Sequence, residues 1–128
     1  MIRSPKVMLT ALLATCLFMT GQALAQIDNG VYEIKSKHSG KLIEVGGASQ
    51  DNGANVNQWP ANGHDTQRWL VTGTDNGYYS LINLNSGKAM EVYSSGTADG
   101  DNITQWEYWG GAAQQWQVTD RGNGYFSL

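Results

Sequence analysis

Residues 39–45 read SGKLIEV, and residues 86–92, which lie 47 positions later, read SGKAMEV. Two further pairs of segments keep this offset: NGANVNQW (52–59) with DGDNITQW (99–106), and QRWLVT (67–72) with QQWQVT (114–119). A third copy opens when GYYSL at 77–81 returns as GYFSL at 124–128. The alignment needs no gap, so the chain contains an internal repeat with a period of 47 residues.

Each copy predicts four short strands, because alternating apolar runs are separated by clusters of Gly, Asn, Asp and Ser. In the first copy we expect strands at 31–36, 41–45, 55–59 and 68–72. Apolar residues at helical spacing are absent, which excludes a helical repeat, and two units are too few to close a propeller.

Three units of four strands make a β-trefoil, which is a six-stranded barrel capped by three hairpins. The sequence therefore predicts an all-β fold of the β-trefoil type, truncated after two lobes (30–72 and 77–119) and the first strand of a third, at 124. A barrel left open in this way has unpaired strand edges. We expect such a chain to be partly unfolded, or to self-associate through the open trefoil.

The N-terminus predicts a signal peptide at residues 1–25, followed by one domain at 26–128. Arg3 and Lys6 precede an apolar run at 7–18, and Ala-Leu-Ala at 23–25 is the small-x-small pattern of a cleavage site. The run is too short for a membrane span, and a lipid anchor on Cys16 is the weaker alternative. The protein is thus expected to be secreted, or periplasmic in a Gram-negative host. Because Cys16 is the only cysteine, the domain forms no disulfide.

Charge argues against two classes of partner. The whole chain has a formal net charge of −3, and residues 26–128 hold six basic and eleven acidic side chains. A nucleic-acid partner requires a basic face, and so does an anionic membrane surface. We therefore expect neither nucleic-acid binding nor membrane insertion.

The pattern S-G-K-x-x-E-V, then G-x-N-[VI]-x-Q-W, then Q-x-W, resembles the ricin-type β-trefoil lectins, especially their bacterial carbohydrate-binding modules. The resemblance covers the chain from about Val31 to its last residue. It implies a domain that binds sugars without catalysis, with one shallow pocket in each lobe. The sugar-binding positions that it implies are Glu44, Trp59 and Gln67 in lobe one, and Glu91, Trp106 and Gln114 in lobe two; strand geometry adds Asn57 in lobe one.

The chemistry of these residues suits those roles. A carboxylate accepts charge-assisted hydrogen bonds from neighbouring sugar hydroxyls, and a Trp face offers a flat apolar platform for a pyranose ring. Asn57 lies two residues before Trp59, so in a strand both side chains project from the same face.

The sequence also departs from the family pattern. Both acidic positions hold Glu where the family usually has Asp, and the Asn that precedes Q-x-W is Thr66 in lobe one and Ala113 in lobe two. Asn57 becomes Thr104 in lobe two, so lobe one keeps more of the polar set and is the preferred site. The family's first cysteine of each lobe is replaced by Leu42 and Ala89, which indicates core positions.

Each candidate also has a structural interpretation. Trp69 and Trp116 are expected in the barrel core, with Gln67 and Gln114 bonded to backbone. Glu44, Glu91, Trp59 and Trp106 are open to either role. Tyr108 and Trp109 form a second platform or cover a hairpin, and His38 and His64 are expected at the surface without a metal.

Catalysis has little support in the sequence. A glycosidase needs two carboxylates on either side of one bond, whereas Glu44 and Glu91 are equivalent positions in different lobes. No catalytic motif, metal site or cofactor site is predicted. We expect a secreted module that binds polysaccharide or cell-surface glycans. The alternatives are a protein-binding trefoil similar to a protease inhibitor, and a broken accessory module of a larger glycoside hydrolase.

Overall fold

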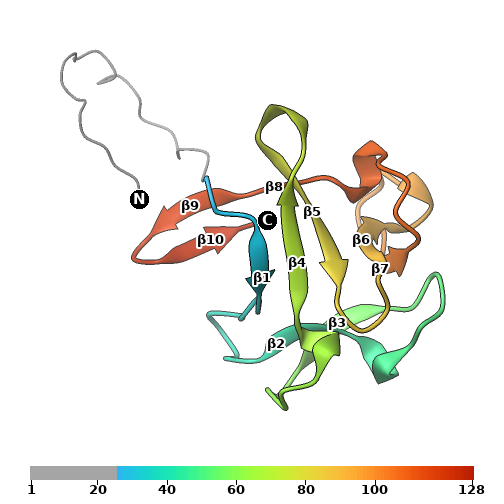
Figure 1. The fold of residues 1–128 in the computed structure, drawn as a ribbon, viewed down its shortest axis with the longest axis horizontal. Helices are drawn as coiled ribbons and strands as arrows, with labels where there is room; N and C mark the ends of the chain where they lie inside the picture. The colour runs from blue at the N-terminus through green and yellow to red at the C-terminus, as the bar shows by residue number, and fades with distance from the viewer. Residues whose placement is uncertain (1–25) are drawn as a thin grey trace.

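The computed structural model describes residues 26–128, so the predicted leader at 1–25 lies outside the described residues. Short strands and single turns of 3-10 helix make up this part of the chain (Figure 1). The strands of the first copy are β1 (Gly30–Tyr32), β2 (Leu42–Val45), β3 (Val56–Trp59) and β4 (Trp69–Gly73). Those that follow are β5 (Tyr78–Asn83), β6 (Ala89–Val92), β7 (Ile103–Trp106), β8 (Trp116–Gln117), β9 (Thr119–Gly122) and β10 (Tyr125–Ser127). Within residues 26–128, no helix has the length and apolar character needed to cross a membrane.

The all-β expectation is confirmed, and most strand bounds agree with it to within a residue or two. The first strand is an exception, since β1 ends at Tyr32 and only Lys35 pairs further on, as an isolated bridge to Leu42. The fourth strand of lobe two is the other exception, because it is divided into β8 and β9. The predicted turn before β2 has Gly40 at a φ of 73°, a conformation that favours glycine.

Strand pairing repeats with the sequence. β1 pairs with β4 with Tyr32 opposite Trp69, and β5 pairs with β8 with Tyr79 opposite Trp116. β4 pairs with β5, and β9 pairs with β10 in the equivalent register. Two antiparallel hairpins, β2–β3 and β6–β7, lie beside the central strands β4 and β5, and they meet at a bridge between Asn55 and Thr104 (Figure 1). This is a β-trefoil of two lobes and the first strand of a third.

One apolar core joins the two lobes. Its buried members come from strands of both copies: Val45, Trp69, Val71, Tyr79, Leu81, Met90 and Val118. Leu42 and Ala89 are also buried, which confirms them as core positions. Trp69 is fully buried as expected, and its indole Nε1 donates to the carbonyl of Ile43.

Trp116 is only half-buried, at the margin of this core. Its indole Nε1 makes the equivalent bond, to the carbonyl of Met90. The difference lies in the neighbouring strand: Asn83 of β5 lies opposite Trp69, whereas β10 ends at Ser127 and places no residue opposite Trp116. The expectation of a core tryptophan therefore holds fully in lobe one and only in part in lobe two.

Candidate functional site

In lobe one, Glu44 and Gln67 lie together at the base of the hairpin. Glu44 is on β2, and Gln67 ends the 3-10 turn η5 (Asp65–Gln67); both side chains are buried. The amide Nε2 of Gln67 donates to Glu44 Oε1 at 3.1 Å and to the carbonyl of Pro60 at 3.0 Å. Its Oε1 accepts from the backbone N–H of Asn62 at 3.0 Å. Gln67 thus joins the carboxylate to the loop between β3 and β4.

Lobe two repeats this arrangement at Gln114, which ends the turn η8 (Ala112–Gln114). Its Nε2 donates to Glu91 Oε1 and to the carbonyl of Glu107, both at 2.9 Å. Its Oε1 accepts from the backbone N–H of Trp109 at 2.9 Å. Both glutamines therefore bond to backbone, as their structural interpretation predicted, and each one also orients a buried carboxylate.

These contacts engage one oxygen of each carboxylate. Among the fully buried side-chain oxygens and nitrogens of residues 26–128, only Thr104 Oγ1 lacks a hydrogen-bond partner. The second oxygen of Glu44 and of Glu91 is not among these atoms, although the two residues are only 7% and 4% exposed. An accessible oxygen on an oriented carboxylate is a ready acceptor for a hydroxyl group.

The register of the lobe-one hairpin brings three predicted residues to one face. Glu44 lies opposite Asn57, and Leu42 lies opposite Trp59, so Asn57 and Trp59 project from the same side as the carboxylate. Asn57 is exposed, and its Nδ2 lies 2.9 Å from where a Cβ on Gly46 would be, so glycine leaves room for this amide. Trp59 is 56% exposed. A ring, an amide and a carboxylate thus share one surface.

The lobe-two face has a different composition. Thr104, which stands opposite Glu91, has a hydroxyl in place of the Asn57 amide, and this side chain is buried. Tyr93 takes the place of Gly46, and its ring packs edge-on against Trp106 with centroids 6.3 Å apart. Trp106 is 36% exposed. Lobe two therefore offers paired rings where lobe one offers an asparagine.

Trp109, which the sequence offered as part of a second platform or as cover for a hairpin, lines a shallow groove in lobe two. The groove has a volume of about 460 Å³ and is lined by Val92, Ser95, Gly96, Thr97, Trp109, Ala112 and Ala113. The Trp109 ring lies directly against Gly111, where a Cβ would collide with it. Lobe one has Asn62 at the equivalent position, so the repeat itself gave no signal for this ring.

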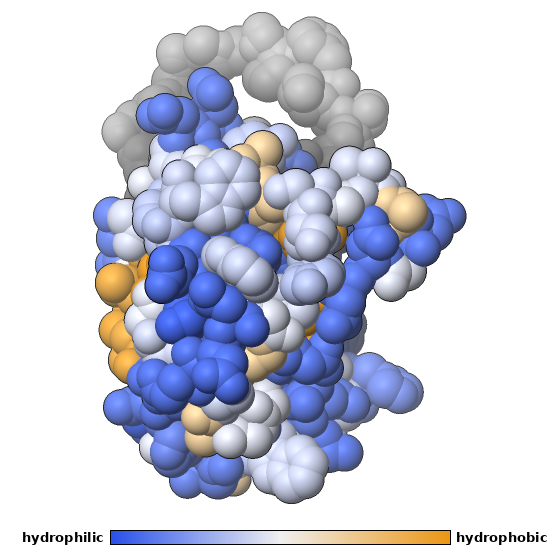
Figure 2. Space-filling view, turned by 90° about the vertical axis from the view of Figure 1, so that its right-hand side faces the viewer, coloured by the Kyte–Doolittle hydropathy of each residue, from blue (hydrophilic) through white to orange (hydrophobic). Residues whose placement is uncertain are grey.

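The face of the molecule that carries β6 and β7 is mostly hydrophilic, with residues of intermediate hydropathy between the polar ones (Figure 2). Tyr108 and Trp109 are exposed on this lobe. Isolated rings on a polar surface suit a polar ligand with apolar C–H faces better than they suit a large apolar partner. Glu44 and Glu91 lie on separate hairpins, β2–β3 and β6–β7, so each lobe presents its own candidate site.

A family model described as ricin-type beta-trefoil lectin domain-like matches residues 22–106 and again residues 67–128. The chain belongs to this family. The two overlapping matches follow from the internal repeat. No curated protein matches the chain.

Several solved structures resemble this family member. A designed threefold-symmetric protein, ThreeFoil, is 40% identical, with a TM-score of 0.70 over 77% of this chain and 71% of that one. An exo-β-1,3-galactanase from Clostridium thermocellum is 31% identical, with a TM-score of 0.68 over 77% of this chain. The match spans only 22% of the galactanase. A lectin from Polyporus squamosus, 14% identical with a TM-score of 0.59 over 77% of this chain and 34% of that one, shows the shared fold alone.

Proposed function

We propose that this protein is a non-catalytic carbohydrate-binding module with one sugar site in each lobe. The observation that carries the proposal is the repeated carboxylate–glutamine pair. In each lobe a buried Glu has one oxygen fixed by Gln and a second within reach of solvent, on the face that carries an exposed Trp. Membership of the lectin-like family supports a binding role in preference to a catalytic one.

In lobe one, Glu44 accepts hydrogen bonds from two neighbouring hydroxyls of the sugar, Asn57 donates to a further oxygen, and Trp59 stacks on the C–H face of the ring. In lobe two, Glu91 has the same role and the Tyr93–Trp106 pair supplies the platform. Lobe one is the stronger site in this proposal, because it has the additional amide. Two weak sites on one chain bind a polymer more tightly than either site alone.

Galactose-containing polysaccharides are the first ligands to test. The chain resembles parts of two enzymes with β-1,3-galactan chemistry in their names, the galactanase above and a GH43 β-1,3-galactosidase that is 29% identical with a TM-score of 0.62. The matches cover 22% and 20% of those enzymes, so they support only an accessory role for the shared module.

Affinity electrophoresis in β-1,3-galactan, with a glycan array beside it, tests the proposal. Glu44→Gln and Glu91→Gln keep an oxygen for the clamping glutamine but lose the charge, so each should weaken its own site about tenfold or more, since a hydrogen bond to a charged group contributes about 1.5–3 kcal/mol. The double variant should lose retention. Glu107→Gln, which changes the charge of an exposed side chain, is the matched control. Unchanged retention of the double variant would contradict the proposal.

We further propose that residues 1–25 direct export and are removed before Gln26. The basis is the sequence pattern alone, a short basic region followed by an apolar run and Ala-Leu-Ala. The intact mass of protein recovered from the culture medium or periplasm should match a chain whose first residue is Gln26. A mass that retains residues 1–25 would refute export by this route.

A further inference from the structure

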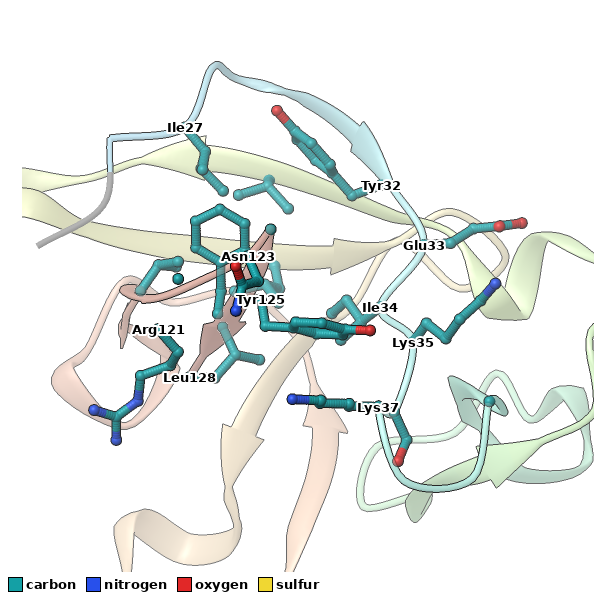
Figure 3. A pocket seen from close by; sticks show the side chains of 18 residues that line it. Ile27, Tyr32, Glu33, Ile34, Lys35, Lys37, Arg121, Asn123, Tyr125 and Leu128 are labelled. Carbon is teal, nitrogen blue, oxygen red and sulfur yellow. The ribbon is translucent and has the colours of Figure 1, made fainter.

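Two hollows in the surface differ in how well their lining suits a sugar. A cavity of about 740 Å³ lies between β1 and β10, where the ring of Tyr125 faces Lys37 (Figure 3). Its lining residues include neither carboxylate of the candidate sites and no tryptophan. The groove of about 460 Å³ in lobe two is lined by Trp109, which is 58% exposed. The groove is therefore the hollow whose lining suits a sugar.

The groove is continuous with the candidate site of lobe two. Val92, which lines the groove, directly follows Glu91, and Ala113, which also lines it, directly precedes Gln114. Gln114 donates from Nε2 to Glu91 Oε1 at 2.9 Å, and its Oε1 accepts from the backbone N–H of Trp109 at 2.9 Å. One glutamine thus holds both the carboxylate and the residue that carries the ring of the groove. Glu91 itself is not a lining residue, so the groove adds to the site instead of repeating it.

Glycine at position 111 provides the space that the Trp109 ring occupies. A Cβ at Gly111 would collide with Cη2, Cζ3 and Cζ2 of that ring. Gly111 has a φ of −75° and a ψ of 167°, which any residue adopts, so the backbone does not require glycine here. The equivalent positions of lobe one carry Asn62 and His64. The lobes therefore differ at two coupled positions, and the pair in lobe two places a ring at the groove.

Lobe one uses the equivalent positions for contacts within the protein. Asp65, which corresponds to Ala112, pairs with Arg68 at 2.9 Å. Gln50, which corresponds to Thr97, donates at 2.9 Å to a backbone carbonyl in the turn between β5 and β6. These longer side chains and their bonds occupy the region that alanine and threonine leave open in lobe two. The groove is thus specific to lobe two.

The chemistry of the lining suits a neutral sugar unit. The face of Trp109 is a flat apolar surface for C–H groups, and Ser95 and Thr97, which are exposed, each offer a hydroxyl that donates and accepts. None of the lining residues carries a charge, so nothing in the groove compensates the desolvation of a charged ligand. The volume of about 460 Å³ falls within the range of small-molecule sites, about 300–1,000 Å³.

We propose that lobe two binds two consecutive neutral sugar units, the first at Glu91 and Trp106 and the second in the groove. The inference rests on the proposed function, because the first unit is the one that the proposed site of lobe two holds. The second unit stacks on Trp109 and forms hydrogen bonds with Ser95 and Thr97. Lobe one, which has an asparagine in place of this ring, binds a single unit. The ligand class of lobe two is therefore a neutral oligosaccharide of at least two units.

The test compares saccharides of increasing length on each lobe separately. Glu44→Gln silences lobe one and Glu91→Gln silences lobe two, so each variant reports the other lobe. Calorimetry with galactose, β-1,3-galactobiose and β-1,3-galactotriose, and with the matching glucose series, gives the affinities. In the Glu44→Gln protein the disaccharide should bind about tenfold more tightly than the monosaccharide, because the second unit adds a ring contact and hydrogen bonds. In the Glu91→Gln protein the two affinities should agree within about twofold.

Two substitutions remove the ring from the groove in different ways. Trp109→Asn introduces the residue of lobe one, and Gly111→Ala keeps the ring but fills its space. In the Glu44→Gln background each should reduce the ratio of disaccharide to monosaccharide affinity from about ten to about two. Tyr78→Asn removes a partly exposed ring outside the groove lining, so it is the matched control and should keep the ratio. Melting temperatures confirm that all three variants fold.

The outcomes separate this inference from the proposed function. Monosaccharide binding by the Glu44→Gln protein without a gain from the second unit would overturn the inference and leave the sugar site at Glu91 in place. A gain that survives both Trp109→Asn and Gly111→Ala would also overturn it, because the second unit would then bind outside the groove. If the Glu44→Gln protein binds none of the saccharides, the proposed site of lobe two is itself wrong, and the inference fails with it.

Discussion

The two hairpins, β2–β3 and β6–β7, occupy equivalent positions of the repeat but have different surroundings. Gln105 of β7 is fully buried and its amide donates to the carbonyls of Ser49 and Asp51 in lobe one. Gln58, its counterpart on β3, is exposed and accepts only a hydroxyl bond from Ser39. Lobe two therefore packs against the 49–51 loop of lobe one. Within residues 26–128, no loop packs against Gln58 of lobe one in the same way.

The comparison changes how exposure of the two tryptophans is interpreted. Trp106 is 36% exposed, with Tyr93 and Gly53 in contact, whereas Trp59 is 56% exposed. Part of the exposure of Trp59 therefore reflects the absent neighbour, and its exposure alone does not identify a binding ring. The hydrogen-bonded pair of Glu and Gln, which is the same in both lobes, is the better indicator of a candidate site.

The largest expected effect on stability comes from adding a segment that packs beside lobe one as lobe one packs beside lobe two. A second copy of residues 82–119 appended after Leu128 should close the barrel and bury Gln58 as Gln105 is buried. Because the edges of β1 and β10 would then be paired, we expect one sharp thermal transition and a monomer in sedimentation. Without the addition we expect a broad transition or a larger species. A sharply melting monomer of residues 26–128 alone would contradict the conclusion that the unpaired edges of β1 and β10 limit its stability.

The next effect distinguishes a core ring from a surface ring within lobe one. Trp69→Ala removes a fully buried side chain and should cost about 3–5 kcal/mol of unfolding free energy. Trp59→Ala should cost less than about 1 kcal/mol, because the ring is largely exposed. Urea unfolding followed by circular dichroism gives both values. Similar losses would show that the division between core and surface is wrong.

A smaller effect measures the contact between the lobes. Gln105→Ala leaves the carbonyls of Ser49 and Asp51 without their donor, so we expect a loss of about 1–3 kcal/mol. Gln58→Ala is the matched control and should change stability by less than about 0.5 kcal/mol. Equal losses in the two variants would mean that the lobe contact contributes nothing beyond the hairpin itself.

The smallest effect has the opposite sign. Thr104 Oγ1 is buried without a hydrogen-bond partner, so Thr104→Val replaces an unsatisfied hydroxyl with a methyl group of similar shape. We expect stabilisation by about 1 kcal/mol, measured as a higher denaturant midpoint. Asn57→Val, at the exposed equivalent position, should produce no such gain. A destabilised Thr104→Val would show that the hydroxyl has a partner in solution.

The repeat was enough to predict the fold, since each four-strand unit recurs without a gap and Leu42, Ala89 and Trp69 are buried as expected. The family resemblance placed Glu44 and Gln67 in the same candidate site, but the hydrogen bond between the two side chains was not predicted. Trp109 was named as a possible platform, but the groove that it lines was not predicted, because the groove forms between residues 92–97 and 109–113, and the repeat does not show that these segments are neighbours.

Burial could not be read from the repeat either. Equivalent positions carry the same residue in different surroundings, as Gln58 and Gln105 demonstrate, and the surroundings depend on which lobe lies alongside. The division of the last strand of lobe two into β8 and β9 has the same origin, because β5 and β10 pair with successive parts of it.

The hydrogen bonds of Gln67 and Gln114 hold each loop in place without using the side chains that differ between the lobes. Gln67 and Gln114 each fix a loop through backbone atoms of that loop, so the clamp places no demand on the loop's side chains. Asn62 in one loop and Trp109 in the other have diverged while both clamps persist. Such an architecture lets the loops of duplicated lobes diverge in their side chains at little cost in stability.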